Sequence, residues 1–199
     1  MTRRVINLTG GNMPISRAIC GGTELLDSIS ILKKIDLSPG MKVADLGCGG
    51  SGHFSFQVAR IVGDEGVVYA VDILKSVLRT IEVKAKLEGI NNIKTVWSNL
   101  EVLGAAKIED GFLDAALLVN ILFQSKKHQE IFKETARVLK RGGKLLVIDW
   151  KPTGGAFGPP IQNRVKKDSL RMIATGEGFR VREEFEAGQY HFGIIFEKE

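Results

Sequence analysis

The chain has few of the residues that would support a secreted, membrane-spanning or metal-dependent fold. Its two cysteines, Cys20 and Cys48, are too few for a disulfide framework, so a reducing cytoplasm is expected. No apolar stretch approaches the ~20 residues needed to cross a bilayer, and the first residues lack the apolar segment of a signal peptide. The sequence has no C-x-x-C and no clustered histidines, so no metal site is predicted.

The composition indicates one globular domain. The 199 residues are 44% hydrophobic and 26% charged, which suits a single core and argues against disorder. The net charge is +5 and the sequence pI is about 9.2. A basic balance fits either a globular protein with many surface lysines or one with an anionic substrate such as RNA, and charge alone does not choose between them.

Residues 43–54 are the most informative part of the chain. An apolar run enters a cluster of four glycines, Asp45 lies two positions before the first of them, and an amphipathic pattern begins at Phe54. This predicts a strand, a tight turn and a helix, with a backbone that a ligand can approach closely. A second strand ends at Asp72, about 20 residues after the glycines, where an acid suits a ribose diol. A nucleoside-containing cofactor is therefore predicted.

The glycine cluster leaves two cofactors to weigh. Gly47, Gly49 and Gly52 satisfy G-x-G-x-x-G, which is typical of dinucleotide sites. Asp45 would repel a pyrophosphate at the start of the helix, whereas an ammonium group would gain from it. S-adenosylmethionine (SAM) has an ammonium group, a sulfonium, a ribose diol and no phosphate. The acid therefore favours SAM over NAD.

Regular alternation predicts parallel strands joined by right-handed crossovers. Strands are expected at 41–47, 66–72, 93–97, 112–119 and 143–149, and helices at 22–35, 51–62, 75–88, 127–139 and 167–176, with a short irregular helix near 101–107. The last 21 residues contain two strands, 179–186 and 190–197, with no room for a crossover helix. They must pair antiparallel. The predicted class is α/β, with a doubly wound, mostly parallel seven-stranded sheet, helices on both faces and a C-terminal antiparallel hairpin.

Four segments together resemble the class I SAM-dependent methyltransferases. Val43–Gly52 is similar to the first motif of that family and Ala70–Asp72 to the second. Phe112–Asn120 resembles the fourth strand, and Arg137–Trp150 resembles a helix end, turn and fifth strand. The likeness is close over about 36–150. It implies SAM as the cofactor, and a terminal hairpin that plain dinucleotide-binding domains usually lack.

The resemblance also implies which residues meet the cofactor. Asp45 would lie near its methionine end, Asp72 at the ribose, and Ile73 against the adenine, although Asp72 also suits a helix cap. The family often has Asp where this chain has Asn99, whose amide oxygen can accept the same hydrogen bond without charge. The complete predicted set is Asp45, Gly47, Cys48, Gly49, Asp72, Ile73, Asn99, Leu100 and Asn120. Cys48 would serve through its backbone, and Asn120 would either only turn the chain or contact the methionyl part of the cofactor or the substrate.

Substrate contacts are predicted with less support. His53 follows the glycines, and Trp150 leaves the fifth strand at the carboxyl edge, where such sheets bind substrates. Two glycine- and proline-rich segments, Gly10–Gly22 and Lys151–Arg164, are expected to form lids, each with a cation for an anionic substrate. These cations are Arg17 and Arg164. No catalytic residue is assigned, because methyl displacement chiefly needs alignment.

The expected organisation is a single domain, 1–199. Residues 1–40 form an N-terminal helical extension or lid, 41–150 the cofactor-binding core, and 151–199 the substrate-side loop, helix and hairpin. The leading function is methyl transfer from SAM to a small molecule. The alternatives are an RNA or protein methyltransferase, an NAD-dependent oxidoreductase and a SAM-binding module without turnover. The sequence lacks the Pro-Cys and Asn/Asp-Pro-Pro-aromatic runs of base methyltransferases. The oligomeric state is left open.

Overall fold

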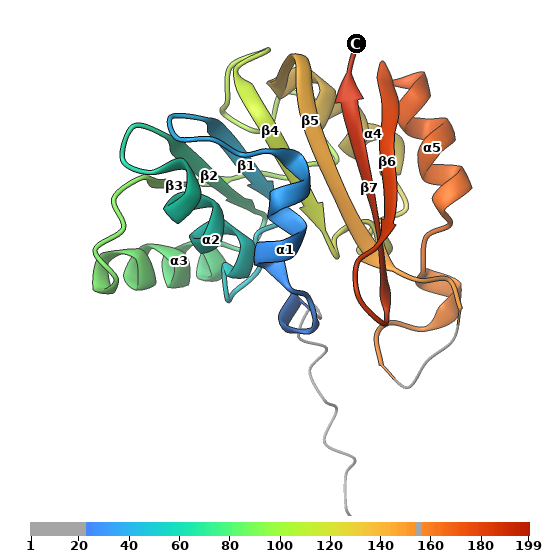
Figure 1. Cartoon of the computed structure of the whole chain (residues 1–199), viewed down its shortest axis with the longest axis horizontal. Helices are drawn as coiled ribbons and strands as arrows, with labels where there is room; N and C mark the ends of the chain where they lie inside the picture. Colours follow the sequence, from blue (N-terminus) through green and yellow to red (C-terminus); the bar gives the residue numbers. More distant parts are fainter. Residues whose placement is uncertain (1–22, 154–156) are drawn as a thin grey trace, which may run out of the picture.

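The computed structural model describes residues 23–153 and 157–199. Within them, seven strands form one sheet in the order β3-β2-β1-β4-β5-β7-β6 (Figure 1). Neighbouring strands are parallel except at β5–β7 and β6–β7. The predicted doubly wound sheet with an antiparallel hairpin is therefore confirmed. The strands are β1 (Lys42–Leu46), β2 (Val67–Asp72), β3 (Ile93–Trp97), β4 (Leu113–Val119), β5 (Leu139–Trp150), β6 (Phe179–Glu186) and β7 (His191–Lys198).

Helices cover both faces of this sheet, as predicted. Successive side chains of a strand point to opposite faces, so Leu146 and Ile148 of β5 pack with α1 and α2, whereas Leu145 and Val147 pack with α4 and α5. Helix α3 packs against α2 and β2 through Ile81. The helices are α1 (Ser28–Leu32), α2 (His53–Val62), α3 (Lys75–Leu87), α4 (His128–Val138) and α5 (Lys167–Gly176), with single 3-10 turns η1 (Thr23–Leu25), η2 (Lys33–Ile35), η3 (Leu122–Gln124) and η4 (Ile161–Asn163).

The sheet topology gathers the ends of several strands at one edge. Strands β1 to β5 are mutually parallel, so their carboxyl ends meet there. The antiparallel register pairs Trp150, the last residue of β5, with His191, the first residue of β7. Any site at this edge is therefore built from the segments that follow β1, β2, β3, β4 and β5, and from the start of β7.

The predicted continuous helix at 22–35 is wrong. Over its described part the chain forms η1, α1 and η2 in succession. The carboxylate of Asp27 accepts hydrogen bonds from the backbone N–H of Ser30 at 3.2 Å and from its hydroxyl at 2.6 Å, so a new helix begins at Ser28. The apolar residues at helical spacing are only partly in the core: Leu26, Leu32 and Ile35 are buried, whereas Leu25 and Ile29 are 48% and 54% exposed.

The short helix predicted near 101–107 is also wrong, because this segment forms turns. Its polar backbone groups are satisfied by side chains of α4. The carboxylate of Glu134 accepts from the N–H groups of Gly104 at 2.7 Å and Ala106 at 3.0 Å, and Arg137 donates to the carbonyl of Ala106 at 2.9 Å. Gly104 has φ +77°, which a regular helix does not allow.

Strand β5 begins earlier than the predicted 143–149. Leu139 already pairs with Leu113 of β4, and the register then shifts before Ala115 pairs with Lys144. Gly142 lies in this irregular stretch with φ +73°, which favours glycine. The glycines that predicted a turn therefore form an irregularity within a longer strand.

Candidate functional site

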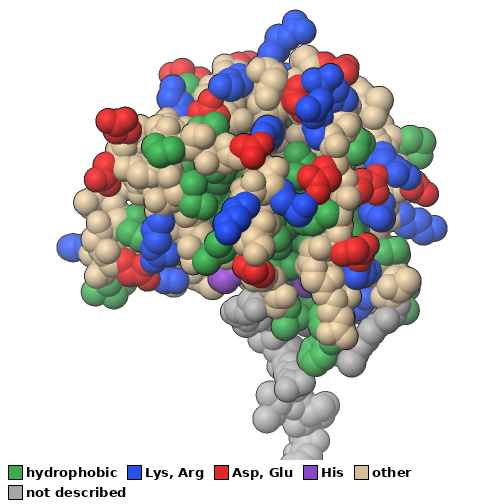
Figure 2. Space-filling view, viewed as in Figure 1, with side chains coloured by type: hydrophobic (Ala, Val, Ile, Leu, Met, Phe, Trp, Pro, Cys, Tyr) green, Lys and Arg blue, Asp and Glu red, His purple; other side chains and the backbone are tan. Residues whose placement is uncertain are grey.

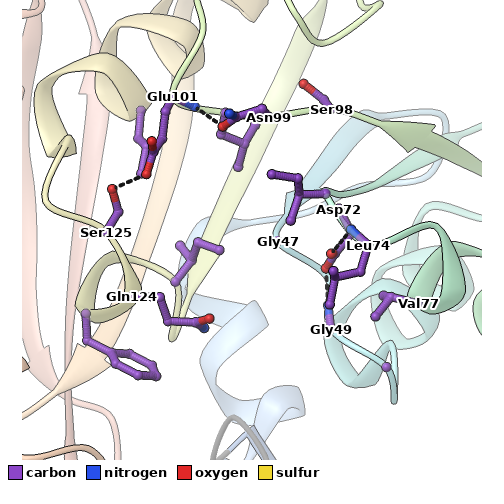
Figure 3. Close-up of a pocket in the computed structure, with 16 residues that line it drawn as sticks. Gly47, Gly49, Asp72, Leu74, Val77, Ser98, Asn99, Glu101, Gln124 and Ser125 are labelled. Atoms are coloured by element: carbon purple, nitrogen blue, oxygen red, sulfur yellow. Dashed lines mark hydrogen bonds between the residues drawn. The ribbon is translucent and has the colours of Figure 1, made fainter.

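A cavity of about 560 Å³ lies where β1, β2, β3 and β4 end (Figure 3). One side is the glycine-rich turn after β1 together with the segment joining β2 to α3. The other side is formed by the loop after β3 and by η3, which follows β4. The lining residues are Gly47, Gly49, Gly50, Asp72, Ile73, Leu74, Val77, Ser98, Asn99, Leu100, Glu101, Ile121, Phe123, Gln124, Ser125 and Ile131.

The three glycines of the predicted motif have different structural roles. A Cβ on Gly47 would lie 2.5 Å from Cδ1 of Ile121, so this glycine accommodates a packed side chain. Gly52 has φ +58° at the start of α2, where a Cβ would lie 2.4 Å from Cδ1 of Ile81. Gly49 has φ +64°, lines the cavity, and has no atom within 4 Å of its would-be Cβ. Of the three, Gly49 best fits the predicted close approach of a ligand to the backbone.

Asp72 joins the turn between β2 and α3 to the glycine loop. Its Oδ2 accepts from Gly49 N–H at 3.2 Å and its Oδ1 from Leu74 N–H at 2.9 Å, as the dashed lines in Figure 3 show. The carboxylate is half-buried and lines the cavity. Two carboxylate oxygens offer about four acceptor positions, so two remain for a ligand after these bonds. The two predicted roles, local capping and ligand binding, are thus compatible.

The residues predicted for the adenine end all lie on the cavity wall. Ile73 is 53% exposed, which leaves an apolar face available, and Leu100 is buried beside the same space. Asn99 also lines the cavity, but its Oδ1 accepts from Glu101 N–H at 3.0 Å. The amide oxygen expected to serve a ligand is therefore shared with the loop's own backbone.

Asp45 and Cys48 are not part of the cavity lining. The Asp45 carboxylate is 2% exposed and accepts from the Ser55 hydroxyl at 2.6 Å. Burial raises the pKa of Asp45 to about 6, despite the lowering effect of Ser55. Cys48 is buried, which raises the pKa of its thiol, and its backbone N–H donates to Val71 O at 3.0 Å. The Cys48 side chain packs in the core with Phe56 and Ile81, and a backbone contact with the cofactor stays a prediction.

Asn120 ends β4 with φ +54°, and it turns the chain without lining the cavity. Its N–H donates to Ile148 O at 2.8 Å, and its carbonyl accepts from Gln124 Nε2 at 2.8 Å. The residues that follow it form the wall. Ile121, Phe123, Gln124 and Ser125 were not predicted, although their position directly after β4 was a signal that could have identified them.

The predicted substrate residues that the structure describes lie apart from the cavity lining. Arg17 and the segment Gly10–Gly22 lie outside the described residues. His53 is half-buried at the first position of α2, and its Nε2 has no hydrogen-bond partner among the described residues. Trp150 is 1% exposed, and its indole packs against the imidazole of His191 with centroids 4.1 Å apart. Burial lowers the pKa of His191 to about 4, so this imidazole is neutral.

Arg164 holds the loop after β5 together. Its guanidinium lies 5.8 Å above the Trp150 ring and donates to several backbone carbonyls at 2.7–3.1 Å. Five donors in a rigid fork suit this use. The cation predicted for an anionic substrate is therefore already engaged. The carbonyls belong to Lys151, Thr153, Phe157 and Pro159.

The charge of the cavity is negative. Its lining includes two carboxylates, Asp72 and Glu101, and no lysine, arginine or histidine among the described residues. The Ser125 hydroxyl donates to the carboxylate of Glu101 at 2.7 Å, and Lys127 Nζ lies 3.4 Å from Glu101 Oε2. Both contacts hold the pKa of Glu101 below its usual range. The ion pair with Lys127 offsets part of the charge of Glu101, so Asp72, which has no ion pair among the described residues, is the main source of a field that attracts a cation and disfavours a pyrophosphate.

Two further features concern only the described residues. No group of three or more His, Cys, Asp or Glu side chains is placed to hold a metal ion. No helix in 23–153 or 157–199 is both long and apolar enough to cross a membrane.

Comparisons with known proteins point to methyltransferases. Residues 37–183 match a family described as a methyltransferase domain. A crystal structure of a SAM-dependent methyltransferase from Aquifex aeolicus superposes with a TM-score of 0.80 at 26% identity, covering 88% of this chain and 92% of that one. The chain belongs to the class I SAM-dependent methyltransferases. SAM is the cofactor of this family.

Curated relatives of this methyltransferase are larger. The ubiquinone/menaquinone biosynthesis C-methyltransferase UbiE of Shewanella woodyi is 36% identical over 144 residues, which are 72% of this chain and 51% of the relative. The protein of the same name from Shewanella sp. strain W3-18-1 is 36% identical over 113 residues, 56% of this chain and 43% of that one. The methyltransferase thus spans about half the length of these relatives.

The cavity of the methyltransferase fits SAM chemically. Asp72 has acceptor positions left for a ribose diol, and Ile73 presents an exposed apolar side chain suited to an aromatic base. The two wall carboxylates suit a ligand with an ammonium and a sulfonium group. The predicted cofactor type thus agrees with the lining, although Asp45, which suggested it, lies behind the wall rather than in it.

Proposed function

We propose that this methyltransferase transfers the methyl group of SAM to a small, largely apolar acceptor by direct displacement. The observation that carries the proposal is the cavity lining, which has two carboxylates and no basic side chain among its described residues. A phosphate-bearing cofactor would lack a partner there, whereas a cationic one gains from the field. The alternative of an NAD-dependent oxidoreductase therefore has no support from the site.

We assign the cofactor contacts residue by residue. Asp72 would bind the ribose hydroxyls, Ile73 and Leu100 would enclose the adenine, and the backbone at Gly49 would approach the ligand closely. Asn99 would add a polar contact beside the bond it makes to Glu101. Bound SAM supplies an electrophilic methyl group, whose displacement leaves a neutral thioether. The chain's part is to align and to exclude water, which together lower such a barrier by ~7–11 kcal/mol.

Asp45 would act at a distance under this proposal. Its carboxylate lies under the glycine loop, bonded to Ser55, and would influence the methionine end of the cofactor through its field rather than by contact. Cys48 would contribute its backbone only. Asn120 would set the direction of the wall that follows it, through the bond between its carbonyl and Gln124.

The acceptor class is inferred from the opposite wall and from the relatives. Ile121, Phe123 and Ile131 give that wall an apolar surface, which suits an aromatic or aliphatic molecule better than a charged one. The named relatives act in ubiquinone and menaquinone biosynthesis as C-methyltransferases. We therefore propose an electron-rich aromatic ring as the acceptor, bound against this apolar wall.

Methylation of RNA or protein is the second candidate. The positive net charge supports it, but the basic residues are spread out. Figure 2 shows Lys and Arg side chains mixed with Asp and Glu over the displayed face. Several of them form pairs, such as Arg171 with Glu184 at 2.6 Å and Arg60 with Glu88 at 2.6 Å. A small acceptor needs no continuous basic surface, so it remains the better proposal.

The test is methyl transfer from SAM labelled in its methyl group. The wild-type protein is incubated in parallel with a panel of phenols and hydroquinones, with total tRNA and with a cell protein extract. Labelled product is expected in the organic extract of the small-molecule reactions. The Asp72→Ala variant should give no labelled product. Label in the RNA or protein fraction alone would overturn the acceptor proposal.

A cytoplasmic location is part of the proposal and is supported by Cys48 being a buried free thiol.

A further inference from the structure

Gln124 points into the cavity from the wall that follows β4. Figure 3 shows its side chain extending from η3 into the space opposite Gly49 and Asp72. Its Nε2 donates to Asn120 O at 2.8 Å, which fixes the carboxamide and leaves Oε1 as the acceptor. No described residue donates a hydrogen bond to Oε1 of Gln124. A neutral acceptor is thus held on a wall whose other polar groups are the carboxylates and hydroxyls described above.

The turn that carries Gln124 is anchored to the centre of the sheet. Asp149 of β5 is fully buried, and its Oδ2 accepts from the N–H groups of Leu122 at 3.1 Å and Phe123 at 3.2 Å. Its Oδ1 accepts from Trp150 N–H at 2.8 Å. A single 3-10 turn has no other acceptor for its first N–H groups, so this carboxylate sets the position of η3.

The same wall touches the glycine loop. Ile121, one residue before η3, occupies the space that a Cβ on Gly47 would need. Two contacts therefore fix the position of η3: the hydrogen bonds to Asp149 and the packing of Ile121 against the glycine loop. Gln124 follows Ile121 by one turn, and its carboxamide reaches the space on the far side of the cavity from Asp72.

We infer that Gln124 Oε1 faces the sulfonium end of bound SAM, and that Asp149 is the positioning residue that holds it there. The inference rests on the proposed cofactor assignment. With the ribose at Asp72, the sulfur, which is one carbon beyond the sugar ring, would lie within reach of the opposing wall. A carboxamide dipole with its oxygen toward a positive sulfonium stabilises the charged cofactor and gains nothing from the neutral thioether product.

The readout is the ratio of the affinities for SAM and for its demethylated product, measured by titration calorimetry. Gln124→Met keeps the length of the side chain and removes the oxygen. It is expected to weaken SAM binding about five- to tenfold and product binding less than about twofold, since one neutral hydrogen-bond-scale contact is lost. Gln124→Glu should raise the ratio above that of the wild type. Gln129→Met is the matched control: it lies at an exposed position of α4, where its amide donates to Glu177, and it should change neither affinity.

Asp149→Asn tests the positioning role. An amide can still accept from η3, but its NH₂ group then opposes the N–H of Trp150, so the turn should shift. The ratio of SAM affinity to product affinity should fall as in Gln124→Met. In the double variant Gln124→Met/Asp149→Asn, the free-energy change in this ratio should be smaller than the sum of the changes in the two single variants. Equal losses for both ligands in Gln124→Met would overturn the inference for Gln124, and an additive double variant would overturn it for Asp149.

These outcomes are distinct from failure of the proposed function. If the wild-type protein binds neither SAM nor its product, the cofactor assignment itself fails. If both bind and the ratio is insensitive to Gln124, the cofactor assignment stands and only the present inference is wrong. Because Gln124 is exposed at the surface of the cavity, its variants are expected to fold.

Discussion

The two halves of the carboxyl edge of the sheet are built differently. Over β1 to β4 the polar groups surround an open cavity, and Asp72 retains acceptor positions. Over β5 and β7 the polar groups are packed away, since Trp150 and His191 are each 1% exposed. The ring nitrogens of both lack hydrogen-bond partners among the described residues. The first half offers a ligand site, whereas the second is packed. Variants in the first half should therefore lower SAM affinity, and variants in the second should lower stability.

The largest effect is expected in the first half, at Gly49. Gly49→Val places a β-branched side chain at φ +64° on the cavity surface, where the strain moves the loop and the side chain fills the ligand's space. SAM affinity should fall by more than about 100-fold, a loss of roughly 3 kcal/mol. Equilibrium dialysis measures the loss. Gly176→Ala, at the end of α5 and outside the cavity lining, with open space around it and no positive φ, should leave affinity within about twofold of the wild type.

Asp72→Ala should have the next largest effect. Removing a charged acceptor from the ribose site costs about 1.5–3 kcal/mol, or roughly 10- to 150-fold in affinity. Binding of SAM is followed by intrinsic fluorescence, and the melting temperature shows whether the fold persists. Asp64→Ala removes an exposed acid from the turn before β2 and serves as the control. An unchanged affinity in folded Asp72→Ala would reduce this residue to a local cap of Leu74.

Arg164→Lys should lower the stability of the fold and leave SAM affinity nearly unchanged, unlike the two variants above. A lysine cannot reproduce the bonds that the guanidinium makes to four carbonyls, so unfolding should become easier by about 1–3 kcal/mol. SAM affinity should change less than about twofold. Chemical denaturation and SAM titration are compared with Arg60→Lys, an exposed arginine paired with Glu88. A large loss of SAM binding with unchanged stability would place Arg164 in the ligand site instead.

The smallest expected effect concerns His191 and pH. Because its folded pKa is lowered to about 4, the unfolded state takes up a proton near pH 6.5 that the folded state refuses, so stability is lost as pH falls. Between pH 7.5 and 5.5 this contribution should decrease by about 1 kcal/mol. His191→Phe keeps the contact with Trp150 and removes the titration.

The wild type and His191→Phe must be compared at each pH. Burial raises the pKa of Asp45 to about 6 and that of Asp149 to about 7, so both carboxyl groups lower stability as pH rises through this window. Their contribution is common to the two proteins and cancels in the difference. If the stability difference between wild type and variant is independent of pH, the imidazole is not excluded from protonation.

The contrast between the two halves also explains what could be predicted from sequence. The β-α alternation, the glycine loop and Asp72 depend on local pattern, and the observed strands follow it to within a few residues except at the start of β5. The role of Arg164 could not be predicted in this way, because a cation in a loop fits a substrate and a backbone clamp equally well. The loop near 101–107 was misread for a similar reason: Glu134 and Arg137, some 30 residues later, satisfy its backbone.

Within the cavity the same limit applies to the wall after β4. Gln124 is an exposed amide in a polar stretch, and only the fold brings it opposite Asp72. Asp149 reads from sequence as the acid at the end of a strand, yet its carboxylate is buried and binds N–H groups of a turn 27 and 26 residues earlier in the chain. Asp45 shows the converse, since it reads from sequence as a ligand contact but is 2% exposed, and its role near the methionine end of the cofactor stays a prediction.

The most direct test of the account is calorimetric titration of the wild-type protein with SAM, its demethylated product and NAD under the same conditions. A cavity whose described lining has two carboxylates and no cation should bind SAM and its product in the micromolar range and NAD at least about 100-fold more weakly. Binding of NAD as tight as that of SAM, or tighter, would contradict the account.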